Sequence, residues 1–202
     1  SSDLVDTIDG QPIGKVNFVL RDSQDRLWLT VSTRIKNWMQ AISPTIVDGF
    51  IALYDKGSLR IVADGFHFTN EIRFDAKEEW LYAVETCGRR IARLRLQPDG
   101  SLTDREVFGP ADHGAFIDGI AFDSVGHLWI TELTRNSIWL ITPQGRGHLV
   151  FEDPAGTAWQ HPTSIAFGGP DLMTAYIGSL VMKKLGTFRV PEAGAEMVHW
   201  RA

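Results

Sequence analysis

The chain has 202 residues, a formal net charge of −5 and a single cysteine, and 44% of its residues are hydrophobic. A composition of this kind supports a buried core and excludes an intrinsically disordered protein. The acidic balance argues against a nucleic-acid-binding protein, one cysteine excludes an internal disulfide or a cysteine zinc cluster, and no apolar run is long enough to span a membrane.

Short apolar segments separated by polar turns run along the whole chain. In chain order we expect strands over residues 16–22, 26–30, 49–57, 69–75, 80–83, 90–96, 117–123, 127–131, 137–142, 163–168, 175–178 and 186–190. Turn residues such as Asp99-Gly100 separate neighbouring strands. No helix is expected, and residues 33–48 are expected to form a long loop across one face.

The strands belong to an internal repeat. Asn17, Asn70, Asp118 and Thr163 hold the same place in successive units, at intervals of 45 to 53 residues. Four short strands in a unit of this length are typical of one blade of a β-propeller. The sequence therefore predicts an all-β propeller with about four blades, with a β-sandwich of coincidental spacing as the alternative.

Three segments carry a resemblance to a known family: residues 162–172 with 175–177, residues 118–123 with 126–130, and residues 69–74. They resemble the SMP-30/gluconolactonase/LRE-like family, whose members are six-bladed β-propellers. The resemblance extends from about Val16 to Val190. It implies a β-propeller of the six-bladed type with about four blades in this chain.

Six such blades need roughly 290 residues. We therefore expect residues 1–202 to form a single propeller domain with a partial ring that lacks its N-terminal blades. An open ring exposes unpaired strand edges and an apolar face. A separate N-terminal fragment or a second chain that completes the propeller is the expected protein partner.

A candidate site follows from the repeated position. Asn17, Asn70 and Asp118 each start the innermost strand of a blade, so we expect them to converge on the central axis. Two amide oxygens and a carboxylate are hard donors that suit Ca²⁺, Mg²⁺ or Mn²⁺. The alternative is that these side chains only cap strand starts and turns.

The resemblance adds roles for these residues. In the family these positions hold metal ligands, so it implies Asn17, Asn70 and Asp118 as ligands of a divalent cation. Ca²⁺ is expected, with Mg²⁺, Mn²⁺ or Zn²⁺ as alternatives. Thr163 occupies a non-ligand position, and the family's fourth ligand, a Glu of the first blade, has no counterpart in this chain.

The expected function is that of a metal-dependent hydrolase of a small-molecule lactone or related ester. Asp118 is expected to act as general base or nucleophile activator, and Lys15 and His67 are candidates for stabilising the oxyanion. Lys15 and Phe18 stand where the family often has Arg and Asp, which puts its sugar-lactone specificity in doubt here. For His67, a structural hydrogen bond is the alternative role.

Two other hypotheses stay open. One is a propeller that binds a ligand without chemistry. The other is a hydrolase that uses Ser1 as an N-terminal nucleophile after autoproteolysis. No nucleic-acid or membrane partner is expected, and the lone Cys87 points to a cytoplasmic location.

Overall fold

The structure is a computed structural model that describes residues 5–197 and residue 200. In this part of the chain it contains seventeen β-strands and one short 3-10 helix, η1 (Trp38–Ala41). The expected all-β class is confirmed, and η1 lies within the segment that was expected to be a loop. Ser1, on which the N-terminal nucleophile hypothesis depends, lies outside the described residues.

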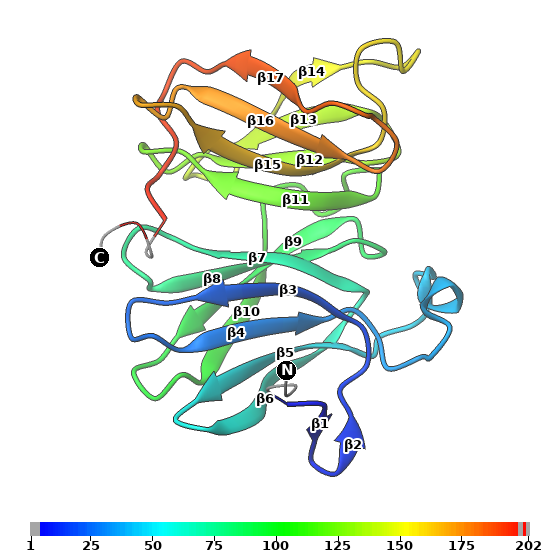
Figure 1. Ribbon diagram of the computed structural model, residues 1–202, viewed down its shortest axis with the longest axis vertical. Helices are drawn as coiled ribbons and strands as arrows, with labels where there is room; N and C mark the ends of the chain where they lie inside the picture. The colour runs from blue at the N-terminus through cyan, green and yellow to red at the C-terminus, as the bar shows by residue number, and fades with distance from the viewer. Residues whose placement is uncertain (1–4, 198–199, 201–202) are drawn as a thin grey trace.

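Most strands belong to four antiparallel sheets, which we call blades A to D (Figure 1). Blade A consists of β3 (Val16–Arg21), β4 (Leu27–Val31), β5 (Gly49–Asp55) and β6 (Ser58–Phe66). Blade B consists of β7 (Thr69–Phe74), β8 (Trp80–Glu85), β9 (Arg90–Leu96) and β10 (Leu102–Phe108). Blade C consists of β11 (Ile117–Phe122), β12 (Leu128–Glu132), β13 (Ser137–Ile141) and β14 (Gly147–Glu152). Blade D has three strands, β15 (Pro162–Gly168), β16 (Thr174–Ser179) and β17 (Gly186–Arg189).

Within each blade the strands follow one another in chain order, and the first strand of one blade lies beside the first strand of the next. The four innermost strands β3, β7, β11 and β15 therefore run in the same direction along the inner edge of the array (Figure 1). We call the end at which these strands begin the mouth end and the other end the far end. The mouth end lies on the right in Figure 1, where η1 is drawn.

Neighbouring blades pack through a repeated aromatic contact. The second strand of one blade contributes a Trp or Tyr ring that meets, edge-on, a Phe of the innermost strand of the next blade. The pairs are Trp28–Phe74, Tyr82–Phe122 and Trp129–Phe167, with ring centroids 5.4, 5.0 and 5.9 Å apart. Edge-on pairs of this kind add about 0.5–1.5 kcal/mol beyond their buried area. The sequence repeat thus produces a repeated interface as well as a repeated sheet.

The two outer faces of the array differ. On blade A, the hairpin of β1 (Thr7–Ile8) and β2 (Gln11–Pro12) covers the outer face, because Ile8 and Ile13 are buried in one cluster with Val31 and Phe50. On blade D, Tyr176 pairs with the innermost strand as Trp28 does in blade A, but its side chain is 37% exposed. No helix in the described residues is both long and apolar enough to cross a membrane.

Candidate active site

A β-bulge interrupts the innermost strand of every blade at the mouth end. The pairing register shifts between Val16 and Phe18, Thr69 and Ile72, Ile117 and Ile120, and Pro162 and Ser164. These shifts include all four repeated positions, so Asn17, Asn70, Asp118 and Thr163 leave the regular alternation of their strands. Bulges re-aim side chains and are over-represented beside active sites.

Two hydroxyl groups fix the orientation of the two asparagine amides. Asn17 Nδ2 donates to Ser32 Oγ at 2.9 Å, and Ser32 Oγ donates to the carbonyl oxygen of Thr69 at 2.8 Å. Since the hydroxyl hydrogen is used on that carbonyl, Ser32 Oγ must accept from the amide nitrogen. The amide oxygen of Asn17 therefore points away from Ser32.

The next blade repeats the arrangement. Asn70 Nδ2 donates to Thr86 Oγ1 at 3.1 Å, and Thr86 Oγ1 donates to the carbonyl oxygen of Ile117 at 2.8 Å. That carbonyl directly precedes Asp118, just as Thr69 directly precedes Asn70. We call these two sets of bonds the hydroxyl relay. Its two hydroxyls were missed in the sequence analysis, because their partners lie on a neighbouring blade.

Asp118 is the acidic member of the predicted set. Burial raises its pKa to about 7, against a hydrogen bond from Asn70 and the positive charge of Lys15, which both lower it. The interactions with Asn70 and Lys15 show that the structure brings three of the predicted residues together. A carboxyl group whose pKa lies near neutrality is suited to proton transfer at physiological pH.

A second carboxylate, Glu71, was not predicted. It follows Asn70 in the bulge of β7 and is 5% exposed, which is rare for a carboxylate without a partner. Burial raises its pKa to about 7, Arg73 pairs with it, and the backbone N–H of Ile120 donates to its Oε2 at 3.3 Å. The charge of Asp118 adds to the rise in the pKa. Glu71 therefore links blades B and C next to Asp118.

Lys15 lies between Asp118 and the loop that carries η1. Its Nζ is 4.7 Å from the ring centroid of Trp38, a cation–π distance. The Trp38 ring in turn lies 6.3 Å from the ring of Phe68. Among the described residues, no ion pair engages Lys15. Its ammonium group is therefore held by an aromatic face and stays open to an anionic or oxygen-rich ligand.

His67 is held by a carboxylate of its own blade. Its Nδ1 lies 2.9 Å from Glu85 Oε2, and Arg90 and Arg105 also contact Glu85. In the part of the chain that the structure describes, no hydrogen bond or ion pair joins His67 to Asp118. The same pairing recurs in the next blade, where His113 Nδ1 lies 3.0 Å from Glu132 Oε1. The recurrence gives the histidine–glutamate pair a structural role in the blades.

The donor set fits a hard divalent cation. The relay turns two amide oxygens away from their hydroxyl partners, and the half-buried carboxylate of Asp118 lies beside Asn70. Within the described residues no group of three His, Cys, Asp or Glu side chains could hold a metal ion. Any cation at the mouth end would therefore depend on the amide oxygens of Asn17 and Asn70 in addition to Asp118, which favours Ca²⁺ or Mg²⁺ over Zn²⁺.

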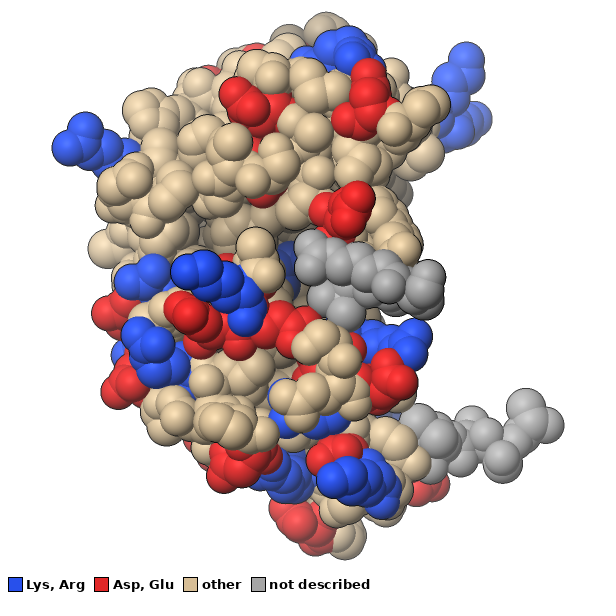
Figure 2. All heavy atoms as spheres, turned by 90° about the vertical axis from the view of Figure 1, so that its left-hand side faces the viewer, with Lys and Arg blue, Asp and Glu red and all other residues tan. Residues whose placement is uncertain are grey.

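The loops at the two ends carry opposite charge. The mouth loops hold Lys15, Arg34, Lys36, Arg89, Arg135, Lys183 and Lys184, against Asp48, Asp112 and Asp153. The far-end loops hold Asp22, Asp25, Asp75, Glu78, Glu79, Asp99, Asp123, Asp171, Glu192 and Glu196, against Arg26, Lys56, Lys77 and Arg146. Figure 2 looks onto the far end, where acidic side chains gather over the lower blades among Lys and Arg. Among the loops, the net negative charge is thus concentrated at the far end.

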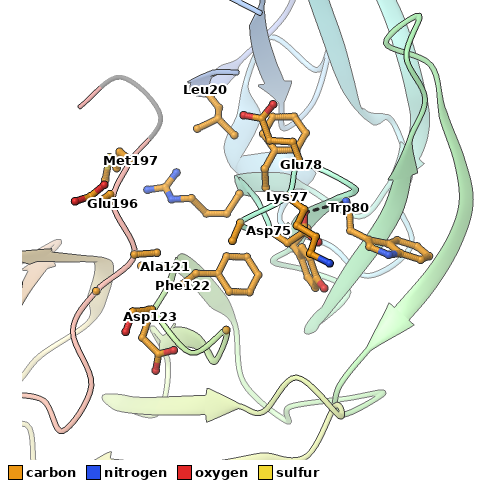
Figure 3. Close-up of a pocket in the computed structure, with 18 of the residues that line it drawn as sticks. Leu20, Asp75, Lys77, Glu78, Trp80, Ala121, Phe122, Asp123, Glu196 and Met197 are labelled. Carbon is orange, nitrogen blue, oxygen red and sulfur yellow. Dashed lines mark hydrogen bonds between the residues drawn. The ribbon is translucent and has the colours of Figure 1, made fainter. Parts of the chain in front are cut away.

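A hollow of about 1220 Å³ opens at the far end, lined in part by Leu20, Trp80, Phe122 and Met197 (Figure 3). The C-terminal segment 193–197 crosses it and is fixed by backbone hydrogen bonds. These are Ser124 N to Ala193 O at 2.7 Å, Gly194 N to Leu172 O at 2.9 Å and Ala195 N to Phe122 O at 2.9 Å. The hollow lies at the opposite end of the innermost strands from Asp118, and the predicted site residues do not line it.

Comparisons with known proteins agree with this geometry. The sequence profile of the SMP-30/Gluconolactonase/LRE-like region matches residues 2–181. A 6-deoxy-6-sulfogluconolactonase of Pseudomonas putida is 30% identical over 122 residues, which cover 59% of this chain and 40% of that protein. A pentonolactonase of Haloferax volcanii is 30% identical over 124 residues, 60% of this chain and 41% of that protein. The chain therefore matches about two fifths of the length of these curated relatives.

The solved structure of a calcium-binding protein, regucalcin, from Agrobacterium tumefaciens superimposes with a TM-score of 0.68 at 20% identity. The match covers 89% of this chain and 61% of that one. At this identity the likeness concerns the fold alone. It agrees with the blade order and with the innermost strands described above.

Proposed function

The chain belongs to the SMP-30/gluconolactonase/LRE-like family, and on that premise we propose that its mouth end is the site of a metal-dependent hydrolase of lactones or related esters. One observation carries the proposal. Asn70 donates a hydrogen bond to Asp118 and the charge of Lys15 acts on that carboxylate, while Ser32 ties Asn17 to Thr69, the residue before Asn70. Three oxygen-bearing side chains in that arrangement suit a divalent cation and an ester carbonyl.

The proposed ligands of the cation are the amide oxygens of Asn17 and Asn70 and the carboxylate of Asp118. Ca²⁺ is the first candidate. A divalent cation in this place supplies polarisation of the ester carbonyl and compensation of negative charge. The relay would contribute pre-organisation, because it restricts the rotation of both amides.

The chain's own residues supply the rest of the reaction. Asp118 would accept the proton of the attacking water through a carboxylate oxygen. Lys15 stabilises the oxygen that becomes negative, through an ammonium group that no described carboxylate pairs with. His67 is a weaker candidate for the same task, because its Nδ1 is bound to Glu85 and only its Nε2 remains for a substrate.

We further propose that another polypeptide segment completes the ring, an N-terminal fragment or a second chain. Its contact would include the outer face of blade D, where Tyr176 holds the aromatic position of Trp28 and lies open to solvent. The inter-blade pairs above imply that the partner presents a Phe or another large apolar side chain to that ring. An intact-mass and native-mass measurement of the purified preparation tests for such a component.

The proposal is tested by ring opening of small lactones with added Ca²⁺, comparing the wild type with Asp118→Ala. We expect kcat/KM to fall by about 10³-fold or more in the variant, because both a ligand and the base are lost. Asp25→Ala, an exposed aspartate of a far-end turn, serves as the control and should retain activity. A D118A protein that hydrolyses lactones at the wild-type rate would refute the assignment.

A ligand-binding propeller without chemistry is the second candidate. Phe18, which lies beside Asn17, favours it, since an apolar side chain there contributes no proton-transfer group. The two candidates separate in one comparison. A Ca²⁺-dependent rise in melting temperature that D118A abolishes, without turnover of any lactone, would support binding alone.

A further inference from the structure

The loop between β4 and β5 is a built element of the mouth. Ala41 and Cys87 are buried together with Phe68, and Ile35, Ile42 and Ile46 pack against them. Thr33 Oγ1 also donates to Asp48 Oδ2 at 2.7 Å, which closes the base of the loop. These contacts fix the position of η1 relative to β7 and β8.

Two large apolar side chains of η1 nevertheless face water. Trp38 is 40% exposed and Met39 is 60% exposed, whereas Ala41 is buried and three isoleucines of the loop are partly buried; Val47, at the end of the loop, is also exposed. Adjoining apolar side chains that an anchored element exposes are a candidate surface for an apolar ligand. Because the loop is anchored, Trp38 stays exposed beside Lys15 at the candidate site.

The path from the reacting group to this surface is short. The charge of Lys15 acts on Asp118, and Lys15 Nζ lies 4.7 Å from the ring centroid of Trp38. A molecule whose carbonyl lies between Asp118 and Lys15 therefore has Trp38 next to it. A substituent that leaves the ring on that side lies beside the indole, and Met39 is the next residue of η1.

We propose that Trp38 and Met39 form a subsite for an apolar substituent, so that the substrates are lactones that carry an alkyl or aryl side chain. This inference rests on the proposed function and names its substrate class. Met39 and the face of the Trp38 ring offer no strong hydrogen-bond partner to a polyhydroxylated substituent, whereas each methylene placed against them leaves water. We call this pair of side chains the rim subsite.

The test is a homologous series of γ-lactones whose alkyl substituent grows from methyl to octyl, with glucono-1,5-lactone as the polar member. Complete burial of a methylene corresponds to about fourfold in affinity. Because the rim subsite is half open, we expect kcat/KM to rise about twofold per methylene. In Trp38→Ala the dependence of kcat/KM on chain length should flatten. The variant should therefore lower kcat/KM for the octyl substrate at least about tenfold more than for the methyl substrate.

A matched control exists at the far end. Val125 lies in a turn and is 50% exposed, and Val125→Ser removes an exposed apolar side chain remote from Asp118. This variant should keep the wild-type slope. A conservative Trp38→Phe change should restore most of the slope that W38A loses.

A second measurement keeps the inference independent of turnover. Ring opening yields a hydroxy carboxylate, so straight-chain carboxylates of increasing length are titrated calorimetrically into the full chain, with and without the Trp38→Ala change. We expect affinity to increase with chain length in the wild type and to lose that dependence in the variant.

The outcomes separate the two proposals. Hydrolysis of lactones with no dependence on chain length, or with glucono-1,5-lactone preferred, overturns the rim subsite and leaves the lactonase proposal standing. If no lactone is hydrolysed but the carboxylates bind with the expected slope, the rim subsite stands and the lactonase proposal fails. A flat slope in the titration overturns the rim subsite whatever the turnover.

Discussion

The two ends of the innermost strands belong to the same sequence repeat, but they differ in strand pairing and in the charge of the loops that follow. At the mouth end, bulges interrupt the strands, and buried polar side chains and basic loops surround Asp118. At the far end, the strands finish in regular pairs, acidic turns follow, and the segment 193–197 is fixed across the hollow. The difference teaches that one repeat can supply a regular scaffold at one end and a polar site at the other, because the innermost strands depart from regular pairing only at the mouth.

After the loss expected for Asp118→Ala, the largest effect comes from the hydroxyl relay at the mouth end. Thr86→Val keeps the shape of the side chain but removes the acceptor of Asn70 and the donor to Ile117. An unpaired buried group costs about 1–3 kcal/mol, so we expect the free energy of unfolding to fall by that amount. If a similar energy is lost from the transition state, kcat/KM falls about 10- to 100-fold. Urea unfolding and lactone hydrolysis measure the two.

The far end supplies the control for the relay. Ser101→Ala removes the hydroxyl that donates to Asp99 Oδ1 at 2.7 Å in an exposed turn. Neither stability nor activity should change appreciably, because water replaces an exposed hydrogen bond. Equal losses in T86V and S101A would contradict the special role of the mouth end.

The second prediction concerns Glu85, which sits at the mouth end of β8. Burial alone would raise its pKa, but hydrogen bonds from Arg90 and His67 and the charge of Arg105 outweigh burial and lower the pKa to about 2. The lowered pKa means that Glu85 stabilises the fold at pH values above its ordinary pKa of 4.5 and loses this effect as the pH falls toward 2.

Glu85→Gln should therefore lower the free energy of unfolding by about 2–3 kcal/mol at pH 7, and by progressively less between pH 4.5 and 2. Urea unfolding at a series of pH values gives the difference curve. Glu192→Gln, an exposed residue of the far end, should give a flat curve. A destabilisation by E85Q that is independent of pH would show that the charge of Glu85 is not responsible.

The third prediction tests the far end. A Cβ added at Gly194 would lie 2.1 Å from Cβ of Phe167, so Gly194→Ala should push the C-terminal segment away and cost about 1–3 kcal/mol. Activity measured below the melting temperature should stay unchanged, since Asp118 lies at the other end. Gly186→Ala is the control, because its added Cβ would approach its neighbours only to 3.6 Å.

The smallest effect concerns the charge of the mouth loops. Lys183→Glu combined with Lys184→Glu should lower kcat/KM for an anionic lactone about two- to fivefold at low salt, with less effect at high salt, because exposed charges are screened. A neutral lactone should show no change. Lys56→Glu with Lys77→Glu reverses the same number of charges at the far end and should have no effect on either substrate.

Much of this architecture could be predicted from the sequence because it depends on local periodicity. The strands and the repeated position of Asn17, Asn70 and Asp118 follow from spacing alone, and the structure brings Asn70, Asp118 and Lys15 together. The roles of these residues, and that of His67, remain predictions until activity is measured.

The sequence could not predict contacts that cross from blade to blade. Ser32 and Thr86 look like ordinary residues at strand ends, and their function appears only when a carbonyl of the neighbouring blade lies beside them. Glu71 was missed for a related reason: a charged side chain after Asn70 suggests solvent, whereas Arg73 and the next blade bury it. The β1–β2 hairpin was too short to leave a periodic signal.

The hydroxyl relay has a mechanical consequence. Because one oxygen of Ser32 or Thr86 both orients an asparagine and holds the adjacent blade, sliding one blade past the next must also rotate an amide. If the mouth binds the proposed cation, its affinity is therefore coupled to the alignment of neighbouring sheets. A ligand that needs both amide oxygens resists shear between the first three blades, and substitutions in distant interfaces can alter its dissociation rate without touching it.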